Sequence, residues 1–206
     1  MEFHAPDHPV MTWRQFFIHI GIVTVGILIA LSLESLVEWR HHRALVNEAR
    51  ENIRREIDEN RTQLKQNDVD VQADMTRMAA NLQLLATLRT TGHTPEGSGL
   101  QYRLAWSGLS DTAWTTARDT GALGFMKYSE VQCYAGIYTQ QQIINTQAMA
   151  LFQAQVRAVS PVLIGGKPDA LTPEERERVL ARSADLLADL KVVGQLMSQW
   201  DTRCAN

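Results

Sequence analysis

Two ionisable residues, His19 and Glu34, stand within or at the edge of an apolar stretch that is otherwise uncharged. Ionisable groups inside a membrane are costly and are commonly kept for proton relays, and a histidine there could be a haem ligand shared between copies. The alternative is structural, with neutral His19 hydrogen-bonding a neighbouring helix and Glu34 reaching into the lipid headgroups. Because both residues lie in the outer turns of the stretch, where the energetic penalty is smaller, we favour the structural interpretation.

The other chemistry-bearing residues form no recognisable site. His41 and His42 are adjacent and point in different directions on a helix, so they could hold a metal only as a ring in an oligomer. Cys133 and Cys204 match no zinc, haem-attachment or redox spacing and leave the redox compartment open. The sequence has no phosphate-binding glycine loop, dinucleotide turn or nucleophile elbow. We therefore expect a protein that is not an enzyme and uses no cofactor or metal.

The apolar stretch that contains His19 determines where the rest of the chain lies. Residues 15–33 contain no Lys, Arg, Asp or Glu, and a helix of that length covers about 28 Å, close to the ~30 Å hydrocarbon core of a bilayer. The sequence predicts a transmembrane helix at residues 16–37 after a flexible leader at residues 1–15. A cleaved signal peptide is the alternative, but the apolar core exceeds the usual length of roughly 7–15 residues and the leader is scarcely basic.

Two features of this stretch indicate its surroundings. Gly26 and Ala30 lie on one face, where small residues let helices approach closely in lipid, so we expect that face to contact another helix. The leader offers only Arg14, whereas Arg40, Arg43 and several later arginines follow the stretch. Because Lys and Arg near a membrane helix favour the cytoplasmic side, the sequence predicts a cytoplasmic C-terminal body.

Residues 38–90 contain neither proline nor glycine and predict one long helical rod. Its apolar positions recur at spacings of three and four, with Asn60 and Asn67 in the same rhythm, and a buried Asn in a coiled coil fixes register and partner number. The predicted oligomer interface combines this seam with the small residues of the membrane helix: Gly26, Ala30, Ile53, Asn60, Leu64, Asn67 and Val71. The alternative, that the rod packs against later helices of its own chain, stays open.

Residues 90–99 contain three glycines and a proline and predict a turn that ends the rod. After the turn, residues 100–109 and 111–118 are expected to form short helices, the second capped by Ser110 or Asp111. They open the C-terminal part of the predicted organisation, a helical bundle that completes the soluble body at residues 100–206.

Aromatic side chains crowd the start of this bundle. Tyr102, Trp106 and Trp114 could line a pocket for a small ligand. Packing of a helical corner is the commoner use of such residues, because aromatic side chains dominate cores and interfaces in general.

The next helix is expected to begin at Ser129, with Gln132 in the capping-box position, and to end before Pro161. Residues 131–156 include no charged side chain but eight amides, which favours a helix surrounded by other helices with amides bonding across. The last helix is expected to begin after the N-cap Thr172 and to extend to about Trp200.

No β-type alternation occurs, and the predicted fold class is all-α: one N-terminal transmembrane helix continues into a long coiled-coil-like helix that packs with shorter C-terminal helices. The net charge is −3, from 20 basic and 23 acidic residues. Because nucleic-acid binding needs a basic field, this balance gives no support for a nucleic-acid partner.

One part of the sequence resembles a known group of proteins. The string Val-Gly-Ile-Leu-Ile-Ala-Leu at residues 25–31, followed by Trp39 and a charged run to Arg43, is similar to the start of uncharacterised bacterial single-pass membrane proteins that join a GILIAL-type membrane helix to a helical body. Ala113-Trp114 and the string Thr-Gly-Ala-Leu at residues 120–123 look like parts of related sequences. The resemblance implies a bacterial inner-membrane protein with a single pass, and it carries no catalytic residues.

These observations lead to two main hypotheses for function. The first is a non-enzymatic, membrane-anchored scaffold or accessory subunit of a bacterial membrane complex, whose partners are the lipid bilayer and a homo-oligomer or larger assembly. The alternative is a single-pass sensor that binds a small ligand near Trp106 and Trp114 and signals through the rod. A third and less favoured hypothesis is an enzyme or redox carrier that uses His19 or a charged cluster near Trp114, formed by Asp111, Arg118, Asp119 and Glu130.

Overall fold

The computed structural model describes residues 12–165 and 167–203, and their regular structure is entirely helical. The helices are α1 (Trp13–Thr91), α2 (Thr112–Asp119), α3 (Tyr128–Gly165) and α4 (Pro173–Ser198), with short 3-10 helices η1 (Ala122–Phe125) and η2 (Pro168–Ala170). The all-α prediction is confirmed, as is a long N-terminal helix that packs with C-terminal helices. Residues 1–11 of the expected leader lie outside the described residues.

The chain divides into two compact units, Met1–Glu48 and Ala49–Asn206, and α1 contributes to both. In the first unit, α1 is long and apolar enough to cross a membrane, and none of its most apolar window is buried in the protein. Its polar groups bond locally: the Ser32 hydroxyl donates to the Leu28 carbonyl oxygen at 2.7 Å, and His19 Nδ1 lies 3.0 Å from the Gln15 carbonyl oxygen. Local bonding of this kind lowers the cost of a polar side chain in apolar surroundings.

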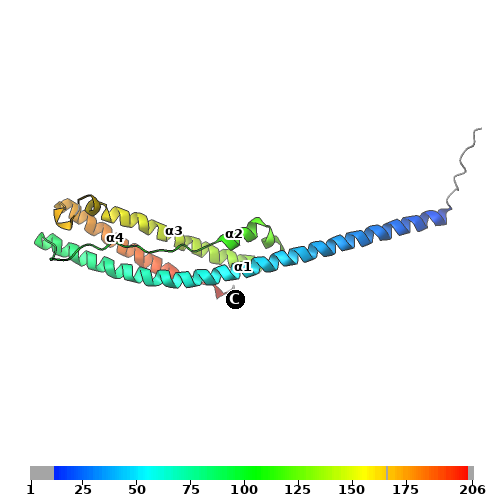
Figure 1. Cartoon of the computed structure of the whole chain (residues 1–206), viewed down its shortest axis with the longest axis horizontal. Helices are drawn as coiled ribbons and strands as arrows, with labels where there is room; N and C mark the ends of the chain where they lie inside the picture. Colours follow the sequence, from blue (N-terminus) through cyan, green and yellow to red (C-terminus); the bar gives the residue numbers. More distant parts are fainter. Residues whose placement is uncertain (1–11, 166, 204–206) are drawn as a thin grey trace, which may run out of the picture. The chain divides into compact units, whose positions relative to one another are not determined.

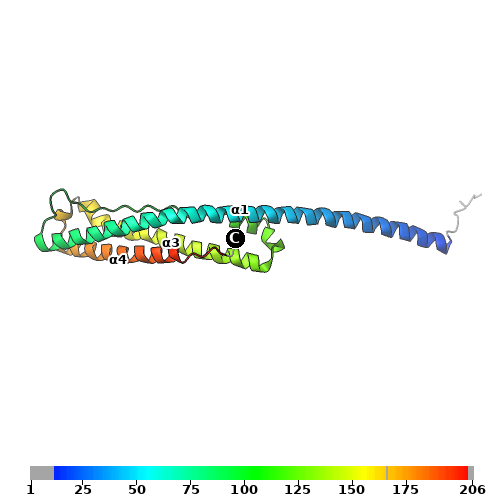
Figure 2. The same ribbon diagram turned by 90° about the horizontal axis from the view of Figure 1, so that it is seen from below.

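The second unit, called the body from here on, places α1, α3 and α4 side by side (Figures 1 and 2). Its main core cluster draws apolar side chains from all three helices and one from the segment before α2: Leu64, Val71, Met78, Leu109, Ile144, Leu151, Leu186, Leu190, Val193 and Met197. A smaller cluster joins Leu85 and Leu88 of α1 to Leu171 and Val179. Each fully buried aliphatic side chain contributes roughly 1.5–3 kcal/mol, so these clusters hold the three helices together.

The segment between the two ends of this bundle differs from the sequence-based expectation. Residues 98–111, called the strap from here on, are extended and irregular, and the helix expected at residues 100–109 is wrong. The α1 helix ends at Thr91 and the chain reverses at Gly92, whose φ of 77° favours glycine. The green trace in Figures 1 and 2 then follows the bundle back toward α2.

The α3 helix also extends further than expected. It begins at Tyr128, so Ser129 lies inside the helix, and it continues through Pro161 to Gly165. A proline in a helix removes one N–H donor, which would leave the carbonyl oxygen of Arg157 unpaired. Arg182 Nη1 of α4 donates to that oxygen at 2.6 Å, and the Ser160 hydroxyl donates to it at 3.2 Å. These two substitute donors explain why the helix does not stop at the proline.

The start of α4 agrees with its sequence signal. The Thr172 hydroxyl accepts a hydrogen bond from the Glu175 backbone N–H, and the Glu175 carboxylate accepts one from the Thr172 N–H, which completes the capping box. The expected N-cap of α2, Asp111, occupies that position but makes no side-chain capping bond. The carboxylate of Glu56 on α1 performs that role instead, by accepting from the Ala113 N–H.

Candidate functional site

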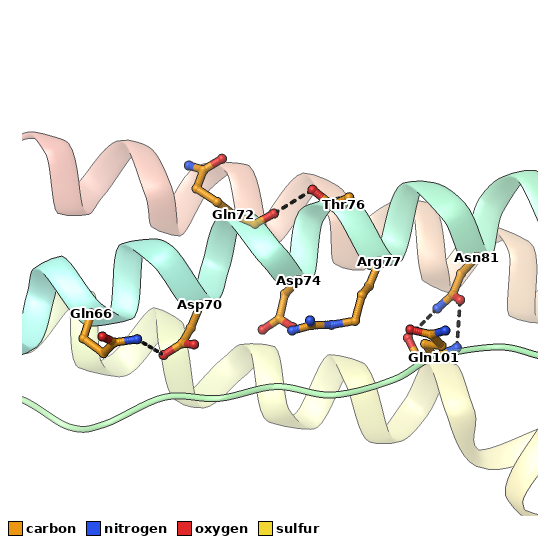
Figure 3. Close-up of polar contacts among 8 residues, drawn as sticks. All are labelled: Gln66, Asp70, Gln72, Asp74, Thr76, Arg77, Asn81 and Gln101. Atoms are coloured by element: carbon orange, nitrogen blue, oxygen red, sulfur yellow. Dashed lines mark hydrogen bonds and ion pairs between the residues drawn. The ribbon is translucent and has the colours of Figure 1, made fainter.

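A regular series of side-chain amides on α1 holds the strap by its backbone. Asn60 donates to the carbonyl oxygen of Ser110 at 2.7 Å and accepts from its N–H at 2.9 Å. Asn67 makes the same pair of bonds with Ser107, at 2.8 and 3.2 Å. Asn81 makes them with Gln101, both at 2.8 Å (Figure 3). Each asparagine thereby satisfies a donor and an acceptor of one strap residue, and we call this series the amide ladder.

The spacing of the amide ladder follows from chain geometry. Asn60, Asn67 and Asn81 lie at multiples of seven residues on α1, while their partners on the strap step by multiples of three. Seven helical residues advance about 10.5 Å, and three extended residues advance about 9–10 Å. The two repeats therefore stay in register over the length of the strap. Because the asparagines satisfy the strap backbone, the strap needs no helical hydrogen bonds of its own.

One position of the ladder carries a carboxylate in place of an amide. Asp74 lies seven residues after Asn67 and seven before Asn81, and the strap repeat places Leu104 opposite it. Its side chain is 3% exposed and pairs with Arg77 of the next turn, while its Oδ2 is buried with no hydrogen-bond partner among the described residues. Figure 3 shows Asp74 and Arg77 on the side of α1 along which the strap passes. An ionised carboxylate has no proton to donate to a backbone carbonyl, so the ladder is interrupted here.

The ladder ends in a buried carboxylate that caps α2. Glu56 of α1 accepts hydrogen bonds from the Ser110 hydroxyl at 2.7 Å, the Ala113 N–H at 2.9 Å and the Tyr138 hydroxyl at 2.7 Å. Its negative charge thus stands at the N-terminal end of α2, where a helix favours an anion. Gln141 of α3 adds a donor to the Ser110 carbonyl oxygen at 2.7 Å. This network joins α1, the strap, α2 and α3 at one point.

The charge and the hydrogen bonds of this network hold the helices in position. Burial raises the pKa of Tyr138, and its hydrogen bond to Glu56 and the charge of that carboxylate raise it further. The Tyr138 ring stacks on Trp114 of α2, with centroids 5.4 Å apart and planes 16° apart. Both oxygens of Glu56 are occupied by protein donors, so this carboxylate serves to position α2 and α3.

A second charged contact joins α1 to the start of α3. Arg50 donates from Nε and Nη2 to the two oxygens of Glu130, at 2.7 and 2.8 Å. These bonds lower the pKa of Glu130 and raise the pKa of Arg50. Arg50, Arg54, Lys127 and Tyr134 line an open hollow here with Glu130. The bidentate geometry fixes the orientation of the two helices.

The predicted interface residues of the rod are covered by the chain itself. Ile53, Leu64 and Val71 are buried in the body, and Asn60 and Asn67 are rungs of the ladder. The alternative of packing within the chain is therefore the one observed in the described residues, and a second copy could reach these side chains only if the body opened. Gly26 and Ala30 are exposed, and the space beside the Gly26 α-carbon is open among the described residues.

The three aromatic residues of the predicted ligand pocket lie in two different surroundings. Tyr102 and Trp106 of the strap pack against the main core cluster, and the Tyr102 hydroxyl lies 2.9 Å from the Ser183 hydroxyl of α4. Burial raises the pKa of Tyr102. Trp114 instead stacks on Tyr138. Each ring has a packing role, and the structure assigns Trp114 to the α2–α3 contact.

The amides of α3 are used less than the sequence suggested. Gln141 and Asn145 bond to strap backbone, with Asn145 donating to the Leu109 carbonyl oxygen at 2.9 Å and accepting from its N–H at 3.1 Å. Gln142, Gln147 and Gln153 are exposed. The expectation that other helices of this chain surround α3 is wrong on this side.

The structure also shows the bonding state of one of the two cysteines. Cys133 of α3 is disulfide-bonded. The only other cysteine of the sequence, Cys204, lies outside the described residues.

Sequence reasoning missed Glu56, Asp74, Asn81 and Gln141 as members of this site. One signal was present, because polar residues recur every seven positions at 60, 67, 74 and 81. That period identifies a buried polar face of a helix but not an extended partner.

Comparison of the chain with protein families, with curated proteins and with solved structures found no match.

Proposed function

We propose that this chain is a non-enzymatic, membrane-anchored protein that self-associates and serves as a scaffold or accessory subunit of a bacterial membrane complex. The observation that carries the proposal is the first part of α1, whose apolar side chains find no cover in the protein. A continuous apolar surface of this kind is unfavourable in water and suits the interior of a bilayer. A signal sequence would meet the same criteria of length and composition, so retention of the segment is part of the test.

The buried polar contacts of the body support a structural role and not a catalytic one. Its buried carboxylate Glu56 is occupied by three protein donors, and the buried asparagines Asn60 and Asn67 are occupied by the strap. Polar groups committed to fixed partners specify one arrangement of the helices. Such a body is suited to presenting a constant surface beside a membrane.

Self-association is assigned to the membrane helix. Gly26 and Ala30 share one open face, and close approach through small residues drives helix pairing in lipid by packing. The rod residues that the sequence predicts for this contact are packed inside the body. The membrane helix therefore replaces the rod as the principal contact between copies.

The mass of the full-length chain in mild detergent tests this proposal. We expect the chain to fractionate with membranes, to keep its N-terminal segment, and to form a particle whose protein mass is a multiple of 23.2 kDa. Gly26→Leu should reduce that mass, because a large side chain separates the helices, whereas Thr24→Leu on the opposite face should leave it unchanged. A strictly monomeric parent chain, or a chain released into water, would overturn the proposal.

The proposal keeps the body on the cytoplasmic side, on the basis of the arginines that follow the membrane helix. The disulfide at Cys133 argues for the other side, because disulfides persist in oxidising compartments. Reporter fusions at the C-terminus decide between the two. Fluorescence of a fused fluorescent protein without activity of fused alkaline phosphatase supports a cytoplasmic body, and the reverse pattern overturns that orientation.

A further inference from the structure

The open hollow beside the pair of Arg50 and Glu130 carries an excess of positive charge. Its charged lining consists of three cationic side chains, Arg50, Arg54 and Lys127, and one carboxylate, that of Glu130. The bidentate contact with Arg50 engages both oxygens of Glu130, so this carboxylate neutralises one of the three cations. The side chains that line the hollow therefore leave two positive charges uncompensated.

The two uncompensated cations come from different elements and are both accessible. Arg54 belongs to α1, and Lys127 immediately precedes α3; both side chains are exposed. The guanidinium of Arg54 interacts with the hydroxyl of Tyr134, a neutral group that leaves the positive charge in place. Lys127 forms no ion pair within the described part of the chain. An anion in the hollow could thus contact a cation from each side.

Uncharged groups of α3 add to the positive character of the hollow. Ser129, the second residue of α3, is exposed and lines it. The ring of Tyr134 is buried, with the residue 1% exposed, and its hydroxyl lies 3.5 Å from a Glu130 oxygen. The first N–H groups of a helix have no partner within the helix, and its N-terminal end favours an anion. The hollow therefore combines fixed hydrogen-bond donors with two available charges.

We propose that this hollow binds the phosphate group of a phosphate monoester. Such a group carries a charge of about −1.5 to −2 at pH 7, which matches the two uncompensated cations, whereas a single carboxylate would balance only one of them. Guanidinium and ammonium groups are the side chains that proteins commonly use to bind phosphate oxygens. The inference does not depend on the proposed function, because the site requires neither the membrane helix nor a second copy of the chain.

The size of the hollow indicates an ester larger than inorganic phosphate. Its volume is about 600 Å³, within the range of roughly 300–1,000 Å³ that is typical of small-molecule sites. A phosphate group alone fills only part of this space, which leaves room for the organic part of the molecule. Phosphate monoesters occur both as soluble compounds and as lipid headgroups, and the contacts with the phosphate would be the same for either source.

Calorimetric titration of the full-length chain in phosphatidylcholine nanodiscs tests the inference. We expect glycerol 3-phosphate to bind, and glycerol, which lacks the charged group, to give no signal. Nanodiscs that also contain phosphatidic acid test the lipid source: they should raise the midpoint of thermal unfolding by a few degrees, because a bound ligand stabilises the folded state. A response to phosphatidic acid alone identifies a lipid headgroup as the ligand. The absence of a response to both phosphates overturns the inference.

Two matched pairs of variants locate the site. Lys127→Ala should weaken binding by about tenfold or more, because it removes a charged donor, whereas Lys191→Ala, at an exposed lysine of α4, should bind as the parent chain does. Arg54→Gln should also weaken binding, and Arg55→Gln, at an exposed arginine outside the hollow, should not. Equal losses within either pair would show attraction to overall charge and overturn the site. A monomeric chain that binds glycerol 3-phosphate would overturn the proposed function and leave this inference standing.

Discussion

The body contains two sets of side-chain amides, one buried and bonded to the strap and the other exposed. On α1, Asn60, Asn67 and Asn81 are buried and each pairs with the backbone of one strap residue. On α3, Gln142 and Gln153 face outward, away from the core. The first set has a partner within the chain, and the second has none among the described residues.

The difference shows that an amide side chain does not by itself indicate whether its residue is buried or exposed. A buried amide is favourable only when both its donor and its acceptor are satisfied, and the extended strap supplies both at each step. The outward amides are exposed and can hydrogen-bond to water instead. We therefore expect large effects on stability from the amide ladder and small effects from the outward amides.

The largest effect should come from breaking a rung of the ladder. Asn67→Ala removes the partner of both the N–H and the carbonyl oxygen of Ser107, and we expect the free energy of unfolding to fall by about 2–3 kcal/mol. Gln142→Ala on the exposed side of α3 should change it by less than about 0.5 kcal/mol. Denaturant unfolding of both variants measures the contrast, and equal effects would remove the distinction between the two sets.

The network at the end of the ladder should give the next effect. Tyr138→Phe removes one of three donors to the buried Glu56, which should cost about 1–2 kcal/mol at pH 7. The folded-state pKa of Tyr138 is raised, so its contribution is present below the unfolded value of about 10 and is lost as the pH rises beyond it.

The pH dependence supplies the control for this network. Unfolding measured from pH 8 to 11 should show a shallower loss of stability in Tyr138→Phe than in the parent chain. Tyr128→Phe alters an exposed tyrosine and should keep the parent slope. Identical slopes in all three proteins would show that Tyr138 does not hold its proton through burial.

Replacing the carboxylate of Asp74 with an amide should stabilise the body. Asp74→Asn replaces a carboxylate whose Oδ2 has no partner in the described part of the chain with an amide that can make both ladder bonds to Leu104. We expect the free energy of unfolding to rise by about 1 kcal/mol, which includes the loss of the pair with Arg77. Asp68→Asn, on the exposed side of α1, should have no measurable effect. A less stable Asp74→Asn protein would mean that the ion pair outweighs the missing rung.

The sequence predicted the helices far better than the strap. Helical periodicity, the glycines near Gly92 and the capping box at Thr172 are local signals, and each marks a boundary that the structure has. The strap has no local signal of its own, because its conformation depends on asparagines 20 to 50 residues away. Local sequence therefore predicts a helix at residues 100–109 where the structure has an extended segment.

The contacts of the candidate site are also difficult to predict from local sequence. Asn60 and Asn67 were recognised as buried polar positions, but a period of seven is shared by coiled coils and by a helix that holds an extended chain. The local rule that proline ends a helix fails at Pro161, because Arg182 of another helix donates to the carbonyl oxygen that the proline leaves unpaired. In both cases the deciding partner is distant in sequence.

The smallest effect should come from the charged pair beside the neutral stretch of α3. Arg50 lowers the pKa of Glu130, so the pair stabilises the body above the unfolded pKa of about 4.5 and loses that contribution as the pH falls through the lower folded value. For a partly exposed pair we expect Glu130→Gln to cost about 0.5–1 kcal/mol at pH 7 and progressively less toward pH 3. Glu59→Gln, at an exposed position of α1, should show neither effect. A cost that stays constant with pH would contradict the ionic origin of the contribution.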